Sequence, residues 1–183
     1  TKGARTSTGT KVTLALKHGF KFDLAKIVEF YARHIDIPIE VRTPTETVIV
    51  TARWRTYSDF LMDQGYRVPV ETPINSFKLE TEDYQCLVSF PSEKHPKLGI
   101  VPHSLIEVSP MRATNLVAIS RRGMFVKYLD LYELIRKWGF IAAMDLDIHT
   151  AAIRLHLGRN DLMTDERLYR LIDDVIERSV HML

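Results

Sequence analysis

Cysteine is almost missing from this 183-residue sequence, and long apolar runs are missing altogether. A single cysteine, Cys86, leaves no partner for an intrachain disulfide, which favours a reducing compartment. No apolar run is long enough to cross a bilayer, and no charged-then-apolar leader opens the chain. We therefore expect a cytoplasmic protein that does not partner a membrane.

An excess of charge of one sign is lacking too. The chain carries 25 Lys and Arg against 23 Asp and Glu, a formal net charge of +2, and the two signs are interspersed. This balance gives no support for a nucleic-acid partner. The sequence also contains no glycine-rich phosphate loop followed by Lys-Ser or Lys-Thr, and no dinucleotide fingerprint. It therefore has no signature of a nucleotide pocket of its own.

The composition that remains is that of an ordinary globular domain. Hydrophobic residues make up 45% and charged residues 26%, and the chain is long enough to bury a core. Residues 1–10 are polar and are expected to form a flexible lead-in. Because the sequence opens on Thr1 and not on methionine, we expect it to be a piece of a longer protein.

Periodicity in the first half predicts strands with a few helices. Asp23 is a good cap for a helix whose apolar side runs through Leu24, Ile27, Val28, Tyr31 and Ile35, and Pro38 is expected to end that helix. The other expected elements are a strand that starts at Val12 and ends near His18-Gly19, an extended segment that begins at 39–41, a strand at 47–52, a short helix at 57–62, and a pair of strands at 77–80 and 85–90.

In the second half, the segments 115–120 and 124–128 flank Arg121-Arg122-Gly123, which fits either one bent strand or a tight hairpin. A helix at 131–138, a small strand at 140–144 and a long amphipathic helix beginning near Thr164 are also expected. Strands interrupted by few helices indicate an α+β domain in which helices cover one face of a mixed sheet.

Arg159 is the strongest candidate for a functional residue. Ile153, Leu155 and Leu157 alternate with polar residues or glycine, as in a half-buried strand, and the long helix follows after Asp161. Arg159 would then stand on a turn between rigid elements, with a planar fork of donors suited to phosphate oxygens. The plainer alternative is a local ion pair with Asp161 or Asp165.

Asp145, Asp147 and His149 occupy alternate positions and would share one face of a strand, as metal ligands do. No fourth ligand is evident, although His156 is near in sequence, and solvated acids that lead into a loop are the ordinary alternative.

Other residue types suggest packing more than chemistry. Four other histidines, His34, His95, His103 and His181, lack neighbours that would suggest a triad. Cys86 lies in a strand-like run, where a buried thiol is favoured over a nucleophile. Trp54, Phe125, Tyr128 and Trp138 could form an exposed patch, but core packing is favoured.

Four segments, taken in order, resemble one protein family. Residues 9–17, Gly-Thr-Lys-Val-Thr-Leu-Ala-Leu-Lys, resemble the last strand of the ATP-binding domain in heat shock protein 90 chaperones. Ile27-Val28, Tyr31 and residues 34–41 resemble the helix and strand by which that family enters its middle domain. Residues 77–91 look like its paired strands, and residues 153–159 are similar to its Leu-Pro-Leu-Asn-x-Ser-Arg segment.

The resemblance implies a divergent, bacterial-type member of this family of stress-response chaperones for protein folding. Residues 1–20 would end the preceding ATP-binding domain and its linker, and residues 21–183 would form the middle domain, the β-α-β layered transducer of GHKL ATPases. Arg159 would be both the catalytic and the cofactor-binding residue, reaching the γ-phosphate of ATP that the missing upstream domain holds, with Mg²⁺. The full-length protein would hydrolyse ATP, although this piece alone would not.

The implied partners are the upstream ATP-binding domain, client or partner proteins, and a second copy in a full-length homodimer. Two alternatives stay open. The first is a non-catalytic protein-interaction module on the same transducer fold. The second is a metal-dependent hydrolase built on Asp145, Asp147 and His149, although our preferred interpretation includes no metal site.

Overall fold

The structure is a computed structural model of the chain, and it describes residues 11–13, 22–63, 74–91, 117–129, 142–154, 163 and 165–182. These residues form an α+β arrangement of three helices, a five-stranded mixed sheet and a separate two-stranded sheet. Within them, no helix has the length and apolar character that crossing a membrane requires.

The five-stranded sheet is built around its middle strand, β7 (Ala143–Ile148). The strand order is β3-β4-β7-β5-β6, with β3 at Ile74–Glu80, β4 at Tyr84–Pro91, β5 at Val117–Arg121 and β6 at Met124–Leu129. β7 is antiparallel to β4 and parallel to β5, and all of its residues are buried. A strand buried on both faces needs cover on each side.

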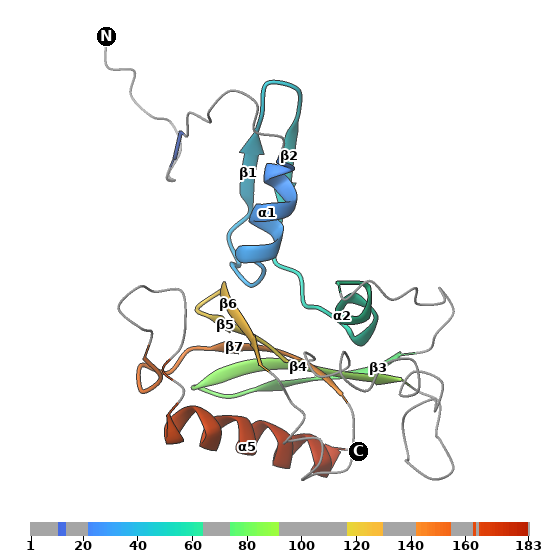
Figure 1. Cartoon of the computed structure of the whole chain (residues 1–183), viewed down its shortest axis with the longest axis vertical. Coiled ribbons are helices and arrows are strands. Elements are labelled where there is room, and N and C mark those ends of the chain that lie inside the picture. The colour runs from blue at the N-terminus through green and yellow to red at the C-terminus, as the bar shows by residue number, and fades with distance from the viewer. Residues whose placement is uncertain are drawn as a thin grey trace.

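Helix α5 (Glu166–Met182) covers one face of this sheet (Figure 1). Its buried side consists mainly of Leu168, Ile172, Val175 and Ile176, at the spacing that predicted the helix. The Asp165 carboxylate caps it by accepting from the backbone N–H groups of Arg167 and Leu168. The predicted long amphipathic helix is therefore confirmed.

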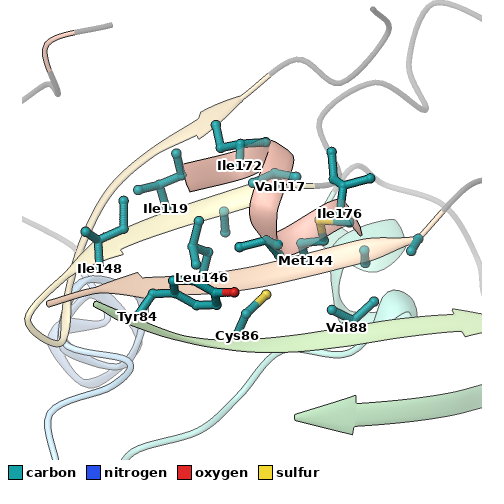
Figure 2. Packing of buried hydrophobic residues seen from close by; sticks show 14 of the residues in the cluster. Tyr84, Cys86, Val88, Val117, Ile119, Met144, Leu146, Ile148, Ile172 and Ile176 are labelled. Carbon is teal, nitrogen blue, oxygen red and sulfur yellow. The ribbon is translucent and has the colours of Figure 1, made fainter. Parts of the chain in front are cut away.

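The apolar core lies between α5 and the middle strands of the sheet, and it includes the strand side chains that point toward α5 (Figure 2). The register places Leu146 opposite Cys86 on one side and Ile119 on the other, so these three share a face. Cys86 is fully buried, as expected for a packing thiol. Burial and the nearby Asp145 charge raise the pKa of the Cys86 thiol, which keeps it protonated and unreactive.

On the other face of the sheet, α2 (Tyr57–Asp63) packs over the middle strands, and α1 (Leu24–Tyr31) meets the edge strand β6 (Figure 1). Helix α1 packs on β6 and on the two-stranded sheet of β1 (Ile39–Arg42) and β2 (Thr47–Val50). Helix α2 packs on β4 and β7. The prediction that helices cover only one face is therefore wrong, because α2 packs on the face opposite to α5.

Helix α1 begins as predicted, with the Asp23 carboxylate accepting from Lys26 N at 3.1 Å, but it ends sooner. Its last residue is Tyr31, so the expected continuation to Ile35 and Pro38 is wrong. The chain turns at Ala32, which sends Arg33 and His34 toward the sheet. Their bonds to β7 replace the next helical turn.

The predicted strand at 140–144 is also displaced, because β7 runs through Ile148 and includes Asp145 and Asp147. The short helix at 57–62 and the paired strands at 77–80 and 85–90 are confirmed, with Glu80 opposite Gln85. Of the strand expected from Ile153 onward, the first two residues are not in a strand: Ile153 lies in a bend, and Arg154 lies in neither a helix nor a strand. Residues 14–16, 131–138 and 155–157, for which elements were also predicted, lie outside the described residues.

The chain between β5 and β6 is a tight hairpin, not one bent strand. Arg122 and Gly123 both have positive φ, 49° and 86°, as a two-residue hairpin turn requires. The pairing register of β5 with β6 shifts between Ile119 and Ser120, and this irregularity places both Phe125 and Tyr128 on the face of α1 and α2. This arrangement makes them packing residues and not an exposed patch.

Candidate functional site

Arg159 lies outside the described residues, but the chain on either side of it is described. Ile153 is buried, and the backbone N–H of Met163 donates to the carbonyl oxygen of Arg154 at 2.9 Å. Earlier, the N–H groups of His149 and Thr150 both donate to the carbonyl oxygen of Asp83 in the β3–β4 turn. The described residues that precede and follow Arg159, up to Arg154 and at Met163, are therefore held by burial and by hydrogen bonds.

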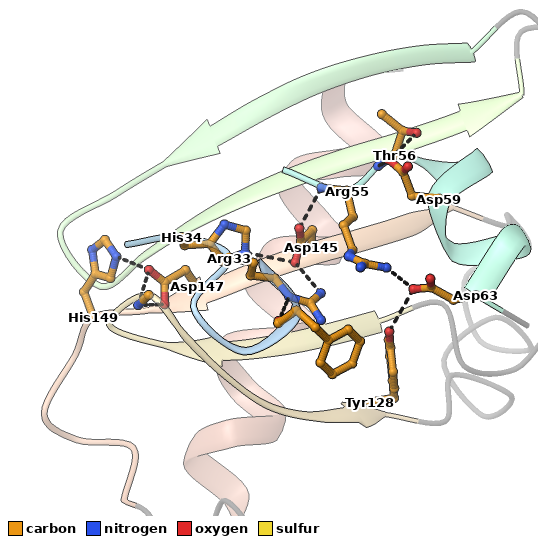
Figure 3. Close-up of polar contacts among 12 residues, drawn as sticks. Arg33, His34, Arg55, Thr56, Asp59, Asp63, Tyr128, Asp145, Asp147 and His149 are labelled. Carbon is orange, nitrogen blue, oxygen red and sulfur yellow. Dashed lines mark hydrogen bonds and ion pairs between the residues drawn. The ribbon is translucent and has the colours of Figure 1, made fainter. Parts of the chain in front are cut away.

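Asp145, on β7, is the centre of a buried polar cluster that joins the sheet to the first part of the chain (Figure 3). Its Oδ1 lies 3.0 Å from His34 Nε2 and 3.5 Å from Arg33 Nη1. Its Oδ2 accepts from the backbone N–H of Arg55 at 2.8 Å. The three side chains in this cluster are at most 2% exposed.

The residues around Asp145 are positioned by both backbone and aromatic contacts. Arg53 N donates to Arg33 O at 2.8 Å, which joins the chain after β2 to the end of α1. The His34 ring stacks on Trp54 with centroids 4.0 Å apart. The Arg33 guanidinium lies 4.4 Å from the Phe125 ring centroid and 4.9 Å from that of Phe30, so its charge is also held by two π faces.

Asp147 organises the second half of the same face. Its two carboxylate oxygens accept from the Gly123 N–H at 2.9 and 3.0 Å, and its Oδ2 lies 3.0 Å from His149 Nε2. The carbonyl oxygen of Gly123 in turn accepts from the backbone N–H of His34 at 3.1 Å. The two acids of β7 are thus connected through one hairpin turn.

The three residues considered as metal ligands do not converge on one point. Asp147 and His149 are paired, whereas Asp145 is occupied by Arg33, His34 and the Arg55 amide. In the part of the chain that the structure describes, no group of three or more His, Cys, Asp or Glu residues could hold a metal ion. The alternative of solvated acids leading into a loop is wrong as well, because Asp145 and Asp147 are 0% and 4% exposed.

A buried carboxylate bound to histidine resembles the base-orienting pair of many hydrolases, but its surroundings indicate another role. The His34 side chain is buried beneath Trp54, so no substrate has access to it. Two donor-capable atoms of the cluster, Arg33 Nη2 and His34 Nδ1, have no hydrogen-bond partner. Burying these charged and polar groups costs free energy that their mutual contacts only partly offset, so the cluster fixes geometry more than it adds stability.

A shallow polar cavity of about 160 Å³ opens beside this cluster. Arg53 donates to Asp59 at 2.8 Å, Arg55 pairs with Asp63, and the Tyr128 hydroxyl donates to Asp63 at 3.2 Å. The cavity lining holds equal numbers of acids and arginines: Glu29, Arg33, Arg53, Arg55, Asp59, Asp63, together with Met62. Because the charges balance, the cavity offers no excess of positive charge to an anion.

Sequence reasoning missed His34, for which no triad-like neighbourhood was expected. Its partner Asp145 is 111 positions away, so only the fold brings the two together. His181 is exposed at the end of α5, and His95 and His103 lie outside the described residues. The signal that could have found the cluster is the alternation of Met144, Leu146 and Ile148 with two acids, which marks a strand with a polar face.

Comparison with known protein families and with curated proteins finds no family and no curated protein that this chain matches.

Proposed function

We propose that residues 21–183 are the middle domain of a heat shock protein 90-like ATP-dependent chaperone, and that residues 1–20 end its ATP-binding domain. The support is the order of four similar segments along the chain, together with an α+β architecture around a mixed sheet. In this proposal the upstream domain and client proteins are the partners of the domain.

The observation that carries the proposal is the anchoring of the segment that contains Arg159. The central strand β7 leads into it, Ile153 is buried before it, and Met163 N is bonded to Arg154 O at its far end. Helix α5 follows at once. An arginine that must meet a phosphate on another domain needs such a fixed base, because misplacement by about 1 Å can cost on the order of 100-fold in rate.

ATP, with its Mg²⁺, would be held mainly by the upstream domain, because this sequence has no phosphate loop. When bound there, the nucleotide supplies the phosphoryl group that is transferred to water. The contribution of this chain is the Arg159 guanidinium, which would donate to the γ-phosphate oxygens and offset the charge on them. An arginine in that role contributes roughly 10³- to 10⁵-fold in rate.

The test is ATP turnover by the protein extended upstream through the ATP-binding domain. Arg159→Ala should lower kcat by at least about 100-fold and change the Kd for ATP by less than about threefold, because the pocket lies upstream. Arg154→Ala is the matched control, since this exposed arginine opens the same segment and contributes only its backbone carbonyl to the Met163 bond. Equal turnover by the two variants would reject the role.

A second candidate is a non-catalytic interaction module on the same fold. It is favoured by exposed apolar side chains in the first third of the chain, where Ile37 and Ile49 are 75% and 66% exposed. An extended protein that binds partner proteins but shows no ATP turnover, with or without Arg159, would support this candidate over the first.

A further inference from the structure

We infer that Asp145 and Asp147 are positioning residues that connect the end of α1 to residues 149–154, the chain that leads toward Arg159; their role in catalysis rests on the proposed function. The connection runs through the β7 network, defined as these two acids and their partners Arg33, His34, Gly123 and His149. No member of the network need touch the nucleotide.

The first step joins α1 to the sheet through His34, which is held at two points. Its ring binds Asp145 Oδ1 at 3.0 Å, and its backbone N–H donates to Gly123 O at 3.1 Å. Arg33 adds a second contact to the same Asp145 oxygen. Because its side chain is bound to β7 and its backbone to the β5–β6 turn, His34 cannot move without disturbing both.

The second step crosses the hairpin turn. Gly123 accepts from His34 with its carbonyl and donates its N–H to both oxygens of Asp147. A Cβ at this position would lie 3.0 Å from Ile35 N and 3.1 Å from the carbonyl carbon of His34. The turn and the end of α1 are therefore in direct contact, with no room for a side chain between them.

The third step reaches the exit of β7. Asp147 Oδ2 binds His149 Nε2, one residue beyond the end of the strand. The carbonyl oxygen of Ile148 accepts from both Arg122 N and Arg121 Nη1 at 3.1 Å. The first residues of the segment that leads to Arg159 are thus held by the same turn that holds His34.

Apolar packing alone would not hold the end of α1, the β5–β6 turn and the end of β7 in one specific geometry. Buried charged groups often add little net stability compared with apolar residues of similar volume, but their hydrogen bonds admit few alternative geometries. A contiguous set of such bonds carries coupling only if a change at one end alters the other, and that requirement is measurable.

The direct test is hydrogen exchange in the 183-residue chain, which needs no ATP. His34→Leu removes the ring contact to Asp145, and we expect amides at 149–154 to exchange at least about tenfold faster. His34→Gln keeps an amide donor and should restore most of the protection. Phe60→Leu is the control, because Phe60 is buried on the same side but forms none of the network's hydrogen bonds.

The reverse perturbation guards against a variant that does not fold. His149→Ala changes a side chain that is one-third exposed, and coupling is reciprocal, so the His34 amide should exchange faster in this variant. The inference is overturned if amides 149–154 in His34→Leu, and the His34 amide in His149→Ala, exchange no faster than the same amides do in Phe60→Leu.

The link to catalysis is read in the upstream-extended protein. His34→Leu should lower kcat about tenfold with KM for ATP unchanged, and His34→Gln should recover it. An unchanged kcat in His34→Leu, where Arg159→Ala abolishes turnover, rejects the positioning role and leaves the proposed function intact. Normal turnover in Arg159→Ala rejects the proposed function, whereas the exchange measurements still decide whether the two ends are connected.

Discussion

The Gly123→Ala substitution tests how closely the β5–β6 turn meets the end of α1. Gly123 has φ of 86°, and a Cβ there would come within 2.8 Å of Ile35 Cγ1 and 3.0 Å of Ile35 N. The side-chain atom could rotate away, but the backbone atoms could not. The turn and the chain after α1 would therefore have to separate, which strains the His34 N to Gly123 O bond.

The expected cost follows from these contacts. A positive φ costs an alanine about 1 to 2 kcal/mol relative to glycine. Weakening one buried hydrogen bond adds about 1 kcal/mol. Alanine recovers about 0.4 to 1 kcal/mol by restricting the unfolded chain. We expect Gly123→Ala to lower the free energy of unfolding by about 2 kcal/mol.

Arg122→Ala provides the comparison within the same turn. Arg122 has φ of 49° and an exposed side chain, and its backbone N–H, which donates to Ile148 O, remains in the variant. Its free energy of unfolding should change by less than about 0.5 kcal/mol. Both variants would be unfolded in urea and followed by circular dichroism. The reasoning is refuted if Gly123→Ala proves as stable as Arg122→Ala.

Three further predictions concern the face of the sheet under α5. Cys86 is the only thiol and is fully buried, so a thiol reagent should modify the native chain at least about 100-fold more slowly than the urea-unfolded chain. Burial raises the Cys86 pKa above its ordinary value of 9.0, so the folded state holds this proton more tightly than the unfolded state does. Because of this difference, the free energy of unfolding should fall by up to about 1.4 kcal/mol per pH unit above pH 9. Cys86→Ala should lessen that fall when unfolding in urea is measured at several pH values. Tyr84→Phe removes the 2.8 Å hydroxyl bond to Asp174 of α5 and should cost about 1 kcal/mol in the same assay, whereas a loss below 0.3 kcal/mol would show that the bond contributes little.

Local signals in the sequence were sufficient for several elements. The apolar spacing from Leu168 to Ile176 specified α5, and Asp23 specified the start of α1, because caps and helical periodicity depend on near neighbours. The pairing of β3 with β4 could be predicted for the same reason. The end of α1 could not, since what ends it is the attraction of Arg33 and His34 to a strand far along the chain.

The candidate site was less accessible to prediction. Taken from the sequence alone, Asp145 and Asp147 predict exposure to solvent. They can lie in a buried strand only because Arg33, His34 and the Gly123 N–H bind their carboxylates. The role of Arg159 came from resemblance, and it stays a prediction.

The distance in sequence between His34 and Asp145 also bears on how the protein is made. At about 5 to 20 residues per second, the 111 positions that separate them take roughly 6 to 22 seconds to synthesise. During that interval Arg33 and His34 have been produced but lack the acid that they bind in the folded protein. The central strand β7 is also synthesised after α2, which packs on it, so Arg33, His34 and α2 must wait for β7 before they can dock.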